Sequence, residues 1–445
     1  MRKAKQMNLK LYITCSLMVF GIYANAQQVL SAEEAVELAL DHNFGIKIAN
    51  NAIEVAENNA GILNSGYLPT LNGNAGATYN VDNTEAEFSN GETTVLNGAE
   101  SSRYNATVNL NYVLFDGLGR KYNYKRLKEE YQLTALDARE TIETTIVQLF
   151  SIYYTVAQLS ENTDALEETM VISKDRLTRA GYQFDYGQNT KLEVLNAEVD
   201  INNDSINLIN IKQQLKNTKR DLNVVMGNQM SDDFDVNTEV RFLLQLDKAD
   251  LLEKTKANNV SLLQAEKNIA ISQFGIKENK AAQFLPQISL IGSYGWNKNN
   301  NNAASFVAVS TNTGLSGGLN LTWDLFDGGA TLTRIRNAKI DLENQKLQKD
   351  LLVIEIERDF NNAWDDFQNK LIIYQVQEDN IKTAKNNFDR TQEKFKIGQV
   401  TSIEFRQAQL NLLNAELSRN QAKYDAKLAE INVLQLSGEL LNVEL

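Results

Sequence analysis

The segment NLNYVLFDG at residues 109–117 returns 211 positions later as NLTWDLFDG at residues 320–328. The segment YGQNT at residues 186–190 returns as IGQVT at residues 397–401 with the same offset. Matches that keep both their order and their spacing are the sequence signature of an internal repeat. The chain of 445 residues is therefore expected to contain two copies of one structural unit.

A third match surrounds the only two prolines of the chain, Pro69 and Pro286. It pairs YLPTLNGNAGATYN at residues 67–80 with FLPQISLIGSYGWN at residues 284–297, at an offset of 217. Proline cannot continue a helix, and it biases the residue before it towards extended backbone. We therefore expect each proline to mark a switch from helix to strand, one in each copy.

The residues after each proline alternate between apolar or small side chains and polar ones. The apolar members of the return segments include Tyr104, Ala106, Val108, Leu110, Tyr112 and Leu114 in the first copy, and Leu315, Leu319, Leu321, Trp323 and Leu325 in the second. This alternation predicts half-buried strands of about 10 residues or more. The connecting segments 82–102 and 298–313 differ in length, so we expect them to be exposed loops.

Each return strand ends in LFDG, which predicts a strand-to-helix turn at Asp116 and Gly117, and again at Asp327 and Gly328. Aspartate is a preferred residue at a helix N-cap, so each Asp is expected to cap the helix that follows. Residues 120–186 then contain no proline. At 1.5 Å per residue, they predict a helix about 100 Å long.

A seven-residue ladder supports this long helix in both copies. Its members are Ile142, Leu149, Val156, Thr163, Met170, Leu177 and Phe184, and then Val353, Phe360, Phe367, Tyr374, Ile381, Phe388 and Phe395 at the positions 211 later. A strict period of seven predicts coiled-coil packing. Gly187 and Gly398 then predict a turn into a returning helix. The ladders expected there are Leu192, Val199 and Ile206, and Ile403, Leu410, Leu417, Tyr424 and Ile431.

Each copy is also expected to open on a helix. Ser31 and Glu34 form a capping-box signature for a helix that runs to about Leu63. Asp247 and Asp250 stand at the matching place of the second copy. The plan of each copy is therefore helix, strand, strand, very long helix, turn and returning helix.

The chain is expected to divide into three parts. Residues 1–26 combine basic residues, an apolar run and a small-residue end, which predicts a secretory signal peptide. Residues 27–230 form the first predicted repeat and residues 231–445 the second. The expected fold class is mainly α with a small β part, internally duplicated, with long antiparallel coiled-coil helices.

Composition excludes several classes of function. Cys15 is the only cysteine and lies in the predicted signal peptide, so disulfides, thiolate metal sites and cysteine nucleophiles are not expected. His42 is the only histidine, which excludes a histidine-based triad and a multi-histidine zinc site. A formal net charge of −13 disfavours nucleic acid as a partner. We expect no catalytic residue, no cofactor and no metal.

Four strands of this length can cross a bilayer when they are tilted, and their alternation is typical of a membrane barrel. Four strands cannot close a barrel in lipid, because each unpaired edge is costly. Two chains would supply eight strands and three would supply twelve. Aromatic residues near the strand ends are expected to form interface belts, or alternatively to fill a core: Tyr79, Tyr104, Tyr294 and Trp296 at one side, and Tyr112, Phe115, Trp323 and Phe326 at the other.

The ordered set of motifs, found twice over residues 27–438, resembles TolC-like outer-membrane efflux proteins. The resemblance implies a homotrimer with a shared twelve-stranded β-barrel in the outer membrane of a Gram-negative bacterium, and an α-helical tunnel across the periplasm. It implies two partners, a periplasmic adaptor (membrane fusion) protein and an inner-membrane transporter. The implied function is a passive export conduit for efflux or for type I secretion.

The resemblance also implies a gate at the turn between each long helix and its returning helix. The residues that match the gate by position are Gly187, Glu193, Arg179 and Phe184 in the first copy, and Gly398, Glu404, Arg390 and Phe395 in the second. The two glutamates match an acidic ring, whereas the chain departs from the members with a second ring, because Asn196 and Gln407 stand where those members carry acids. An alternative is that both glutamates are solvated acids favoured by the helix dipole.

Two other functions compete with the conduit. One is a coiled-coil scaffold of the cell envelope without a pore, which would need no strand alternation. The other is an enzyme with paired carboxylates such as Asp365 and Asp366. Adjacent acids on a helix point in different directions, which disfavours shared chemistry.

Overall fold

The computed structural model describes residues 29–228, 234–243 and 246–442. The predicted signal peptide, residues 1–26, lies outside the described residues. Within the described ranges, no helix has both the length and the apolar content needed to cross a membrane.

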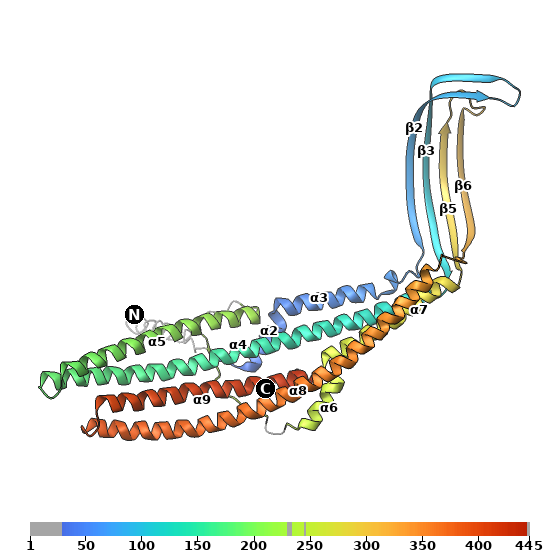
Figure 1. The fold of residues 1–445 in the computed structure, drawn as a ribbon. Coiled ribbons are helices and arrows are strands. Elements are labelled where there is room, and N and C mark those ends of the chain that lie inside the picture. Colours follow the sequence, from blue (N-terminus) through green and yellow to red (C-terminus); the bar gives the residue numbers. More distant parts are fainter. Residues whose placement is uncertain (1–28, 229–233, 244–245, 443–445) are drawn as a thin grey trace, which may run out of the picture. The chain divides into compact units, whose positions relative to one another are not determined.

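Both halves of the chain contain the same order of long elements (Figure 1). The first half contains β1 (Val29–Leu30), α2 (Ala32–His42), α3 (Phe44–Asn59), the 3-10 helix η2 (Ile62–Asn64), β2 (Thr70–Glu87), β3 (Thr93–Asp116), α4 (Gly119–Asp185) and α5 (Lys191–Met226). The second half contains β4 (Asp235–Val236), α6 (Lys248–Asn258), α7 (Val260–Phe284), β5 (Gln287–Asn300), β6 (Val309–Thr322), α8 (Ala330–Lys396) and α9 (Ser402–Leu436). The predicted long helix is confirmed, since α4 and α8 are each 67 residues long.

The predicted opening helix begins as expected but does not run unbroken to Leu63. Ser31 and Glu34 form the capping box of α2. The helix then breaks at Asn43, whose ψ of 128° is not helical. The Nδ2 of Asn43 donates to the carbonyl of Val225 at 2.7 Å, and its Oδ1 accepts from the amide of Ile46 at 3.0 Å. A contact with the end of α5 therefore breaks the helix and caps its next segment.

The second half repeats this break. Asn259 has a ψ of 124° between α6 and α7, and its Nδ2 donates to the carbonyl of Leu436 at 3.0 Å. Each break lies against a glycine just after the returning helix, Gly227 or Gly438, with φ of 67° and 68°. A Cβ on Gly227 would lie 2.4 Å from the carbonyl oxygen of His42, so only glycine fits there.

The four long strands form one antiparallel sheet in the order β2-β3-β5-β6 (Figure 1). The central β3–β5 pair joins the two halves of the chain, with Tyr112 opposite Leu290. Among the described strands, β2 and β6 are each paired on one side only. The sheet therefore presents two free edges, one from each half.

The predicted loops are shorter than expected. Strands β2 and β3 remain paired beyond an irregularity at Asp82 and Thr84, as far as Glu87 opposite Thr93. Only residues 88–92 separate them, so most of the segment 82–102 is strand and not loop. Likewise β5 and β6 pair until Asn300 opposite Val309. The extra polar residues of the first copy lengthen a hairpin, because their backbone groups continue the ladder of hydrogen bonds.

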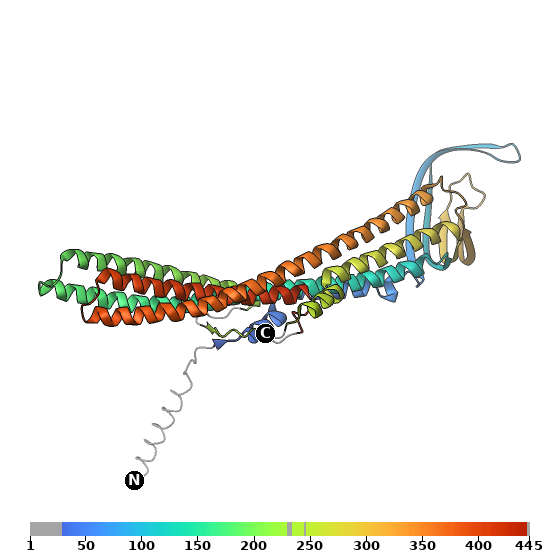
Figure 2. The same cartoon turned by 60° about the horizontal axis from the view of Figure 1, so that its bottom comes forward.

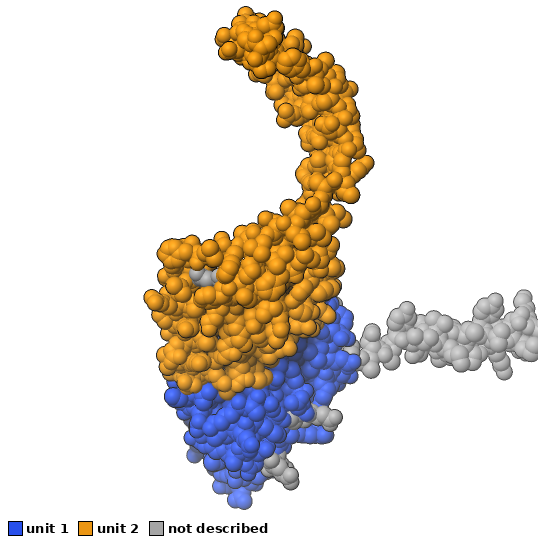
Figure 3. Space-filling view, turned by 90° about the vertical axis from the view of Figure 1, so that its right-hand side faces the viewer, with its two compact units in different colours: residues 1–49, 139–260, 353–445 blue, residues 50–138, 261–352 orange. Residues whose placement is uncertain are grey.

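Two compact units divide the chain (Figure 3). The first contains residues 1–49, 139–260 and 353–445, and the second contains residues 50–138 and 261–352. Each unit draws on both halves of the sequence. The predicted boundaries of the repeats, 27–230 and 231–445, therefore remain a prediction about the sequence.

The first unit contains the main helical core. The ladder predicted for the long helices is confirmed at its centre, where Leu149, Val156, Phe360 and Phe367 are buried. The ladder predicted for α5 is wrong within one chain, because Leu192, Val199 and Ile206 are exposed. Helix α5 instead buries Val194, Ala197 and Asp204, which form a different seam: Val194 lies two positions after Leu192, whereas Ala197 and Asp204 lie two positions before Val199 and Ile206. Ile403 of α9 is also exposed.

Candidate functional site

The two predicted hairpin turns have the same backbone geometry. Gly187 and Gly398 adopt φ of 70° and 76°, which is the left-handed region that favours glycine. The amide of Gln188 donates to the carbonyl of Gln183 at 2.7 Å, and the amide of Gln399 donates to the carbonyl of Lys394 at 2.8 Å. Figures 1 and 2 both show the hairpins α4–α5 and α8–α9 side by side at their turns.

Glu404 is held by the start of its own helix. Its carboxylate accepts from the amide and hydroxyl of Thr401 at 2.8 and 3.0 Å, while the Thr401 hydroxyl accepts from the Glu404 amide at 3.2 Å. These bonds to Thr401, the amide first, lower the pKa of Glu404 below its ordinary value. The side chain is exposed, so the local cap and not burial fixes it.

Glu193 lies in a different setting, although it matches Glu404 in sequence. Its carboxylate accepts from the Nδ2 of Asn189 at 3.0 Å. Glu193 lines a cavity of about 300 Å³ between α5 and α9, together with Asn196 and Gln407. Glu404 does not line that cavity. Within one chain the structure therefore does not bring the two glutamates into one cavity.

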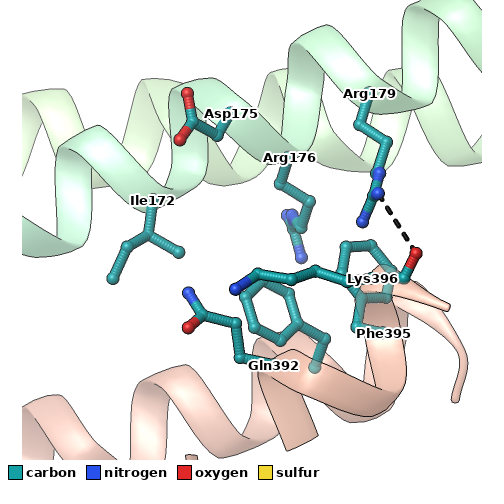
Figure 4. A pocket seen from close by; sticks show the side chains of 8 residues that line it. Ile172, Asp175, Arg176, Arg179, Gln392, Phe395 and Lys396 are labelled. Carbon is teal, nitrogen blue, oxygen red and sulfur yellow. Dashed lines mark hydrogen bonds between the residues drawn. The ribbon is translucent and has the colours of Figure 1, made fainter. Parts of the chain in front are cut away.

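Arg179 and Phe395 meet at the end of the long helices. The Arg179 guanidinium carbon lies 5.4 Å from the centroid of the Phe395 ring, and its Nη2 donates to the carbonyl of Lys396 at 3.3 Å. Phe395 stacks on Phe405 with centroids 4.5 Å apart and an interplanar angle of 2°. Figure 4 shows this group around a cavity of about 360 Å³. A cation over an aromatic ring stabilises the contact between α4 and α8.

Arg390 and Phe184 stand at the matching positions but do not meet within one chain. Arg390 is exposed. Phe184 is 40% exposed and lies under the Nζ of Lys191, 5.5 Å from the ring centroid. The four predicted arginine and phenylalanine residues therefore form one pair within the chain, not two.

A buried charged cluster next to the turns was not predicted from the sequence. Arg406 of α9 contacts Asp204 of α5 at 2.7 and 2.8 Å, and its Nη1 also donates to the hydroxyl of Ser173 at 3.2 Å. The Nε2 of Gln409 donates to the carbonyl of Thr169 at 3.0 Å. The cluster joins α9 of the second half to both helices of the first-half hairpin.

One sequence signal could have revealed this cluster. Asp204 stands seven residues after Ala197 in the seam that contains Val194, so it places a charge in an otherwise apolar ladder. A buried charge needs a partner. A second contact nearby joins Arg176 to Asp200.

The strand-to-helix and helix-to-strand switches lie in the second unit. Pro69 and Pro286 each directly precede a strand, β2 and β5. Asp116 accepts from the amide of Arg120 at 2.7 Å, and Asp327 accepts from the amide of Thr331 at 2.8 Å.

The glycine after each aspartate, Gly117 or Gly328, has a left-handed φ of 68° or 72°.

Throughout the described residues, no group of three or more His, Cys, Asp or Glu side chains could hold a metal ion.

A sequence model of the outer membrane efflux protein family matches residues 35–228 and 251–439. The chain belongs to this family. The two matched stretches correspond to the two halves described above. As a member of the family, the chain is an outer-membrane protein that serves efflux, and the family is one of transport channels and not of enzymes.

Individual relatives are distant in sequence but similar over most of their length. The outer membrane efflux protein BepC of Brucella suis biovar 1 (strain 1330) is 21% identical over 96% of this chain and 90% of BepC. The outer membrane protein TolC of Escherichia coli (strain K12) is 21% identical over 77% of this chain and 71% of TolC.

Solved structures share the fold. The CmeC outer membrane channel of Campylobacter jejuni superimposes with a TM-score of 0.75 at 18% identity, covering 92% of this chain and 86% of CmeC. The outer membrane protein VceC of Vibrio cholerae has a TM-score of 0.70 at 14% identity, covering 92% of this chain and 96% of VceC. The predicted fold class, mainly α with a small β part, is therefore confirmed as that of outer-membrane channels of this family.

Proposed function

We propose that three copies of this chain form a passive export channel through the outer membrane and across the periplasm. It works with a periplasmic adaptor protein and an inner-membrane transporter that supplies the energy, in tripartite efflux or type I secretion. Relatives named as efflux pump outer membrane proteins, such as the toluene efflux pump outer membrane protein TtgC of Pseudomonas putida, support this assignment. The chain itself performs no covalent chemistry in this proposal.

The proposal of a trimer rests on the two free edges of the sheet. Strands β2 and β6 are each paired on one side only within the described chain. An unpaired edge in lipid leaves a row of amides and carbonyls without partners, which is very costly. If β6 of one copy pairs with β2 of the next, no edge remains. Three copies of four strands then close a barrel of twelve.

The side chains of the edge strand β6 support a lipid-facing surface. Leu315, Leu319 and Leu321 point to one face of the strand and are exposed in the single chain. Ser316 and Asn320 alternate with them on the other face. A barrel in a membrane shows this pattern, apolar towards lipid and polar towards its lumen.

The hairpin turns are the proposed gate. Glu193 and Glu404 from three copies would place six carboxylates around the end of the tunnel, where mutual repulsion attracts cations. Arg179 on Phe395 would hold α4 against α8 while the gate is closed. Selectivity then depends on diameter and on lining charge, as in other channels.

The test is assembly together with conductance. We expect the protein purified in detergent to be a trimer whose β-strand circular dichroism signal resists heat, and to form channels in planar bilayers. A stable monomer that needs no detergent and never conducts would instead support the scaffold without a pore.

A further inference from the structure

We propose that the helix ends beside the four-stranded sheet form a basic belt that binds the headgroups of anionic phospholipids in the inner leaflet of the outer membrane. The inference rests on the proposed channel, because only a sheet that crosses the membrane places these helix ends at a lipid surface. The belt consists of eight exposed side chains on α4, α7 and α8: Lys121, Lys125, Lys128, Lys277, Lys280, Arg334, Arg336 and Lys339.

The belt is basic although the whole chain is acidic, with a formal net charge of −13. Three helix segments next to the sheet contain ten Lys or Arg residues and one acid: 119–128, 276–284 and 330–340. Two of the ten are outside the belt, since Arg120 forms an ion pair with Asp116 and Arg126 forms one with the single acid, Glu278. The positive charge of the other eight is therefore not neutralised by these segments.

The belt residues also lack acidic partners from the rest of the chain. Within the residues that the structure describes, none of the eight forms an ion pair, and Arg334 donates only to the hydroxyl of Thr331, at 2.6 Å. Exposed lysines elsewhere do reach acids on other helices, as Lys212 and Lys256 do at 2.6 and 3.0 Å. The eight charges are thus available to an anion from outside the chain.

Helix stability does not explain these bases. Helices α4 and α8 begin at Gly119 and Ala330, directly after the strands of the sheet (Figure 1). A base near a helix N-terminus is unfavourable, whereas an anion there is favourable. Lys121 and Arg334 lie within the first five residues of these helices. The helix dipoles therefore oppose the two bases and attract the same anions as the belt.

Lys125 of α4 and Lys277 of α7 mark the position in the belt where an anion fits best. Their Nζ atoms lie 5.8 and 5.0 Å from the centroid of the same ring, that of Phe274. Two ammonium groups beside one ring repel each other. A lipid phosphate that accepts hydrogen bonds from both groups removes this repulsion and gains two charge-assisted bonds.

Exposed apolar side chains separate the belt from the sheet. Phe284, Trp323, Leu325 and Phe326 lie at the strand ends, and each is more than half exposed. Aromatic residues are typical of the boundary between hydrocarbon and water, and clusters of Lys and Arg next to it are typical of anionic lipid binding. The chain passes from strand to aromatic residues to bases into α8, and in the reverse order out of α7, as expected for a surface at a lipid interface.

The far end of the sheet carries the opposite charge. Strand β5 ends at Asn300, opposite Ser102 of β3, so most of the β2–β3 hairpin between these strands' last shared pair and its turn extends past β5. Segment 81–100 of this hairpin contains no base and five acids: Asp82, Glu85, Glu87, Glu92 and Glu100. The charge therefore changes sign along the sheet, which makes only the helical end suitable for anionic headgroups.

Lipid binding by the purified trimer tests the belt. Lys125→Gln with Lys277→Gln is compared with the wild type in micelles that contain phosphatidylglycerol or the zwitterionic phosphatidylcholine, and bound lipid is counted by native mass spectrometry. We expect the wild type to prefer phosphatidylglycerol. The variant should bind it at least about fivefold more weakly, the factor that one lysine contributes at an anionic surface. The matched control, Lys174→Gln with Lys216→Gln, removes two exposed lysines far along α4 and α5 and should behave as the wild type.

Two further measurements separate charge from fold and lipid from free anion. Lys125→Arg with Lys277→Arg should keep the preference, because arginine also donates to phosphate. Added salt should weaken the preference of the wild type more than that of the glutamine variant, because salt screens the charges that the variant lacks. Inorganic phosphate that raises the dissociation temperature of the trimer as much as phosphatidylglycerol does would assign the belt to free anions and overturn the lipid.

Tryptophan fluorescence gives an independent measurement at α8. In a Trp296→Phe and Trp364→Phe background, Trp323 is the only tryptophan. In mixed bilayers, phosphatidylglycerol with brominated chains should quench Trp323 more than the same mole fraction of brominated phosphatidylcholine. Arg334→Gln with Arg336→Gln should bring the two lipids close to equal quenching. Equal quenching already in the wild-type belt would contradict the proposal.

The outcomes distinguish this inference from the proposed channel. Conducting trimers that bind both lipids equally would overturn the belt and leave the channel standing. A chain that forms neither trimers nor channels would overturn both. A photo-reactive residue at position 277 that links to a protein and not to lipid in intact cells would assign the surface to that protein, and would also overturn the lipid.

Discussion

Arg406 and Asp204 form a two-point ion pair that joins the two halves of the chain, with nitrogen–oxygen distances of 2.7 and 2.8 Å. Their side chains are only 11% and 3% exposed. A buried ion pair gains little over an apolar pair of similar shape, but leaving one partner alone in the interior is costly. The pair therefore fixes which helices meet next to the proposed gate.

The first prediction follows from the cost of removing one partner of a buried ion pair. Asp204→Ala should destabilise the folded protein by up to about 3–5 kcal/mol, because Arg406 loses its two-point partner and keeps only a contact of 3.8 Å with Asp200. Asp204→Ala with Arg406→Leu, which removes both charges, should recover much of the loss. Denaturant unfolding of the helical signal measures both. As a control, Lys382→Ala breaks an exposed pair with Asp379 and should change little. Equal losses for the single and double variants would show that the pair does not act as a unit.

The second prediction concerns acid and the start of α9. The pKa of Glu404 is lowered in the folded protein, so its cap contributes fully above the ordinary pKa of the group and is lost as pH falls through the lowered value. Hydrogen exchange of the first α9 amides, corrected for intrinsic rates, should therefore rise at acid pH. In Glu404→Gln this extra rise should disappear. A rise of the same size in the variant would assign the effect to another group.

The sequence was sufficient for features set by local rules. The period of seven predicted that Leu149 and Phe360 are buried, and the two prolines predicted where β2 and β5 begin. It was insufficient where a distant partner decides. The helix break at Asn43 depends on the carbonyl of Val225, which is 182 positions away.

The α5 ladder shows a different kind of difficulty. The sequence of α5 contains two apolar seams, one with Val194 and one with Leu192, and only tertiary packing decides which seam faces α4. The same holds for the site. The sequence pattern predicted the turns at Gly187 and Gly398. It could not predict that Arg179 contacts Phe395 and not Phe184, because that contact depends on how the four helices pack.

The third prediction tests topology. The turn of residues 88–92 joins β2 to β3 and should face the outside of the cell if the sheet crosses the outer membrane. An Asn90→Cys variant should react with a membrane-impermeant thiol label on intact cells. The matched control is Gln188→Cys. Gln188 is an exposed residue in the turn between α4 and α5, so its cysteine should react only after the outer membrane is opened. Protection of Asn90→Cys in folded protein would reverse or reject this topology.

The last prediction concerns charge at the gate. Glu193→Gln with Glu404→Gln should lower cation preference and weaken block by divalent ions in single-channel recordings, because six carboxylates become neutral in the trimer. The glutamines keep size and hydrogen-bonding capacity, so trimer stability should change by less than about 0.5 kcal/mol for such surface positions.

The single variants separate the two positions. Glu193 lines the cavity between α5 and α9, whereas Glu404 is bound to Thr401 at the start of its helix. Because its pKa is lowered, Glu404 stays charged to a lower pH than an ordinary glutamate. Cation preference in Glu193→Gln, which then depends on Glu404, should therefore persist as the solution is acidified below the ordinary glutamate pKa. Unchanged selectivity and block in the double variant would make both residues solvated helix-start acids, and would leave Phe395 and Arg390 as the next gate residues to test.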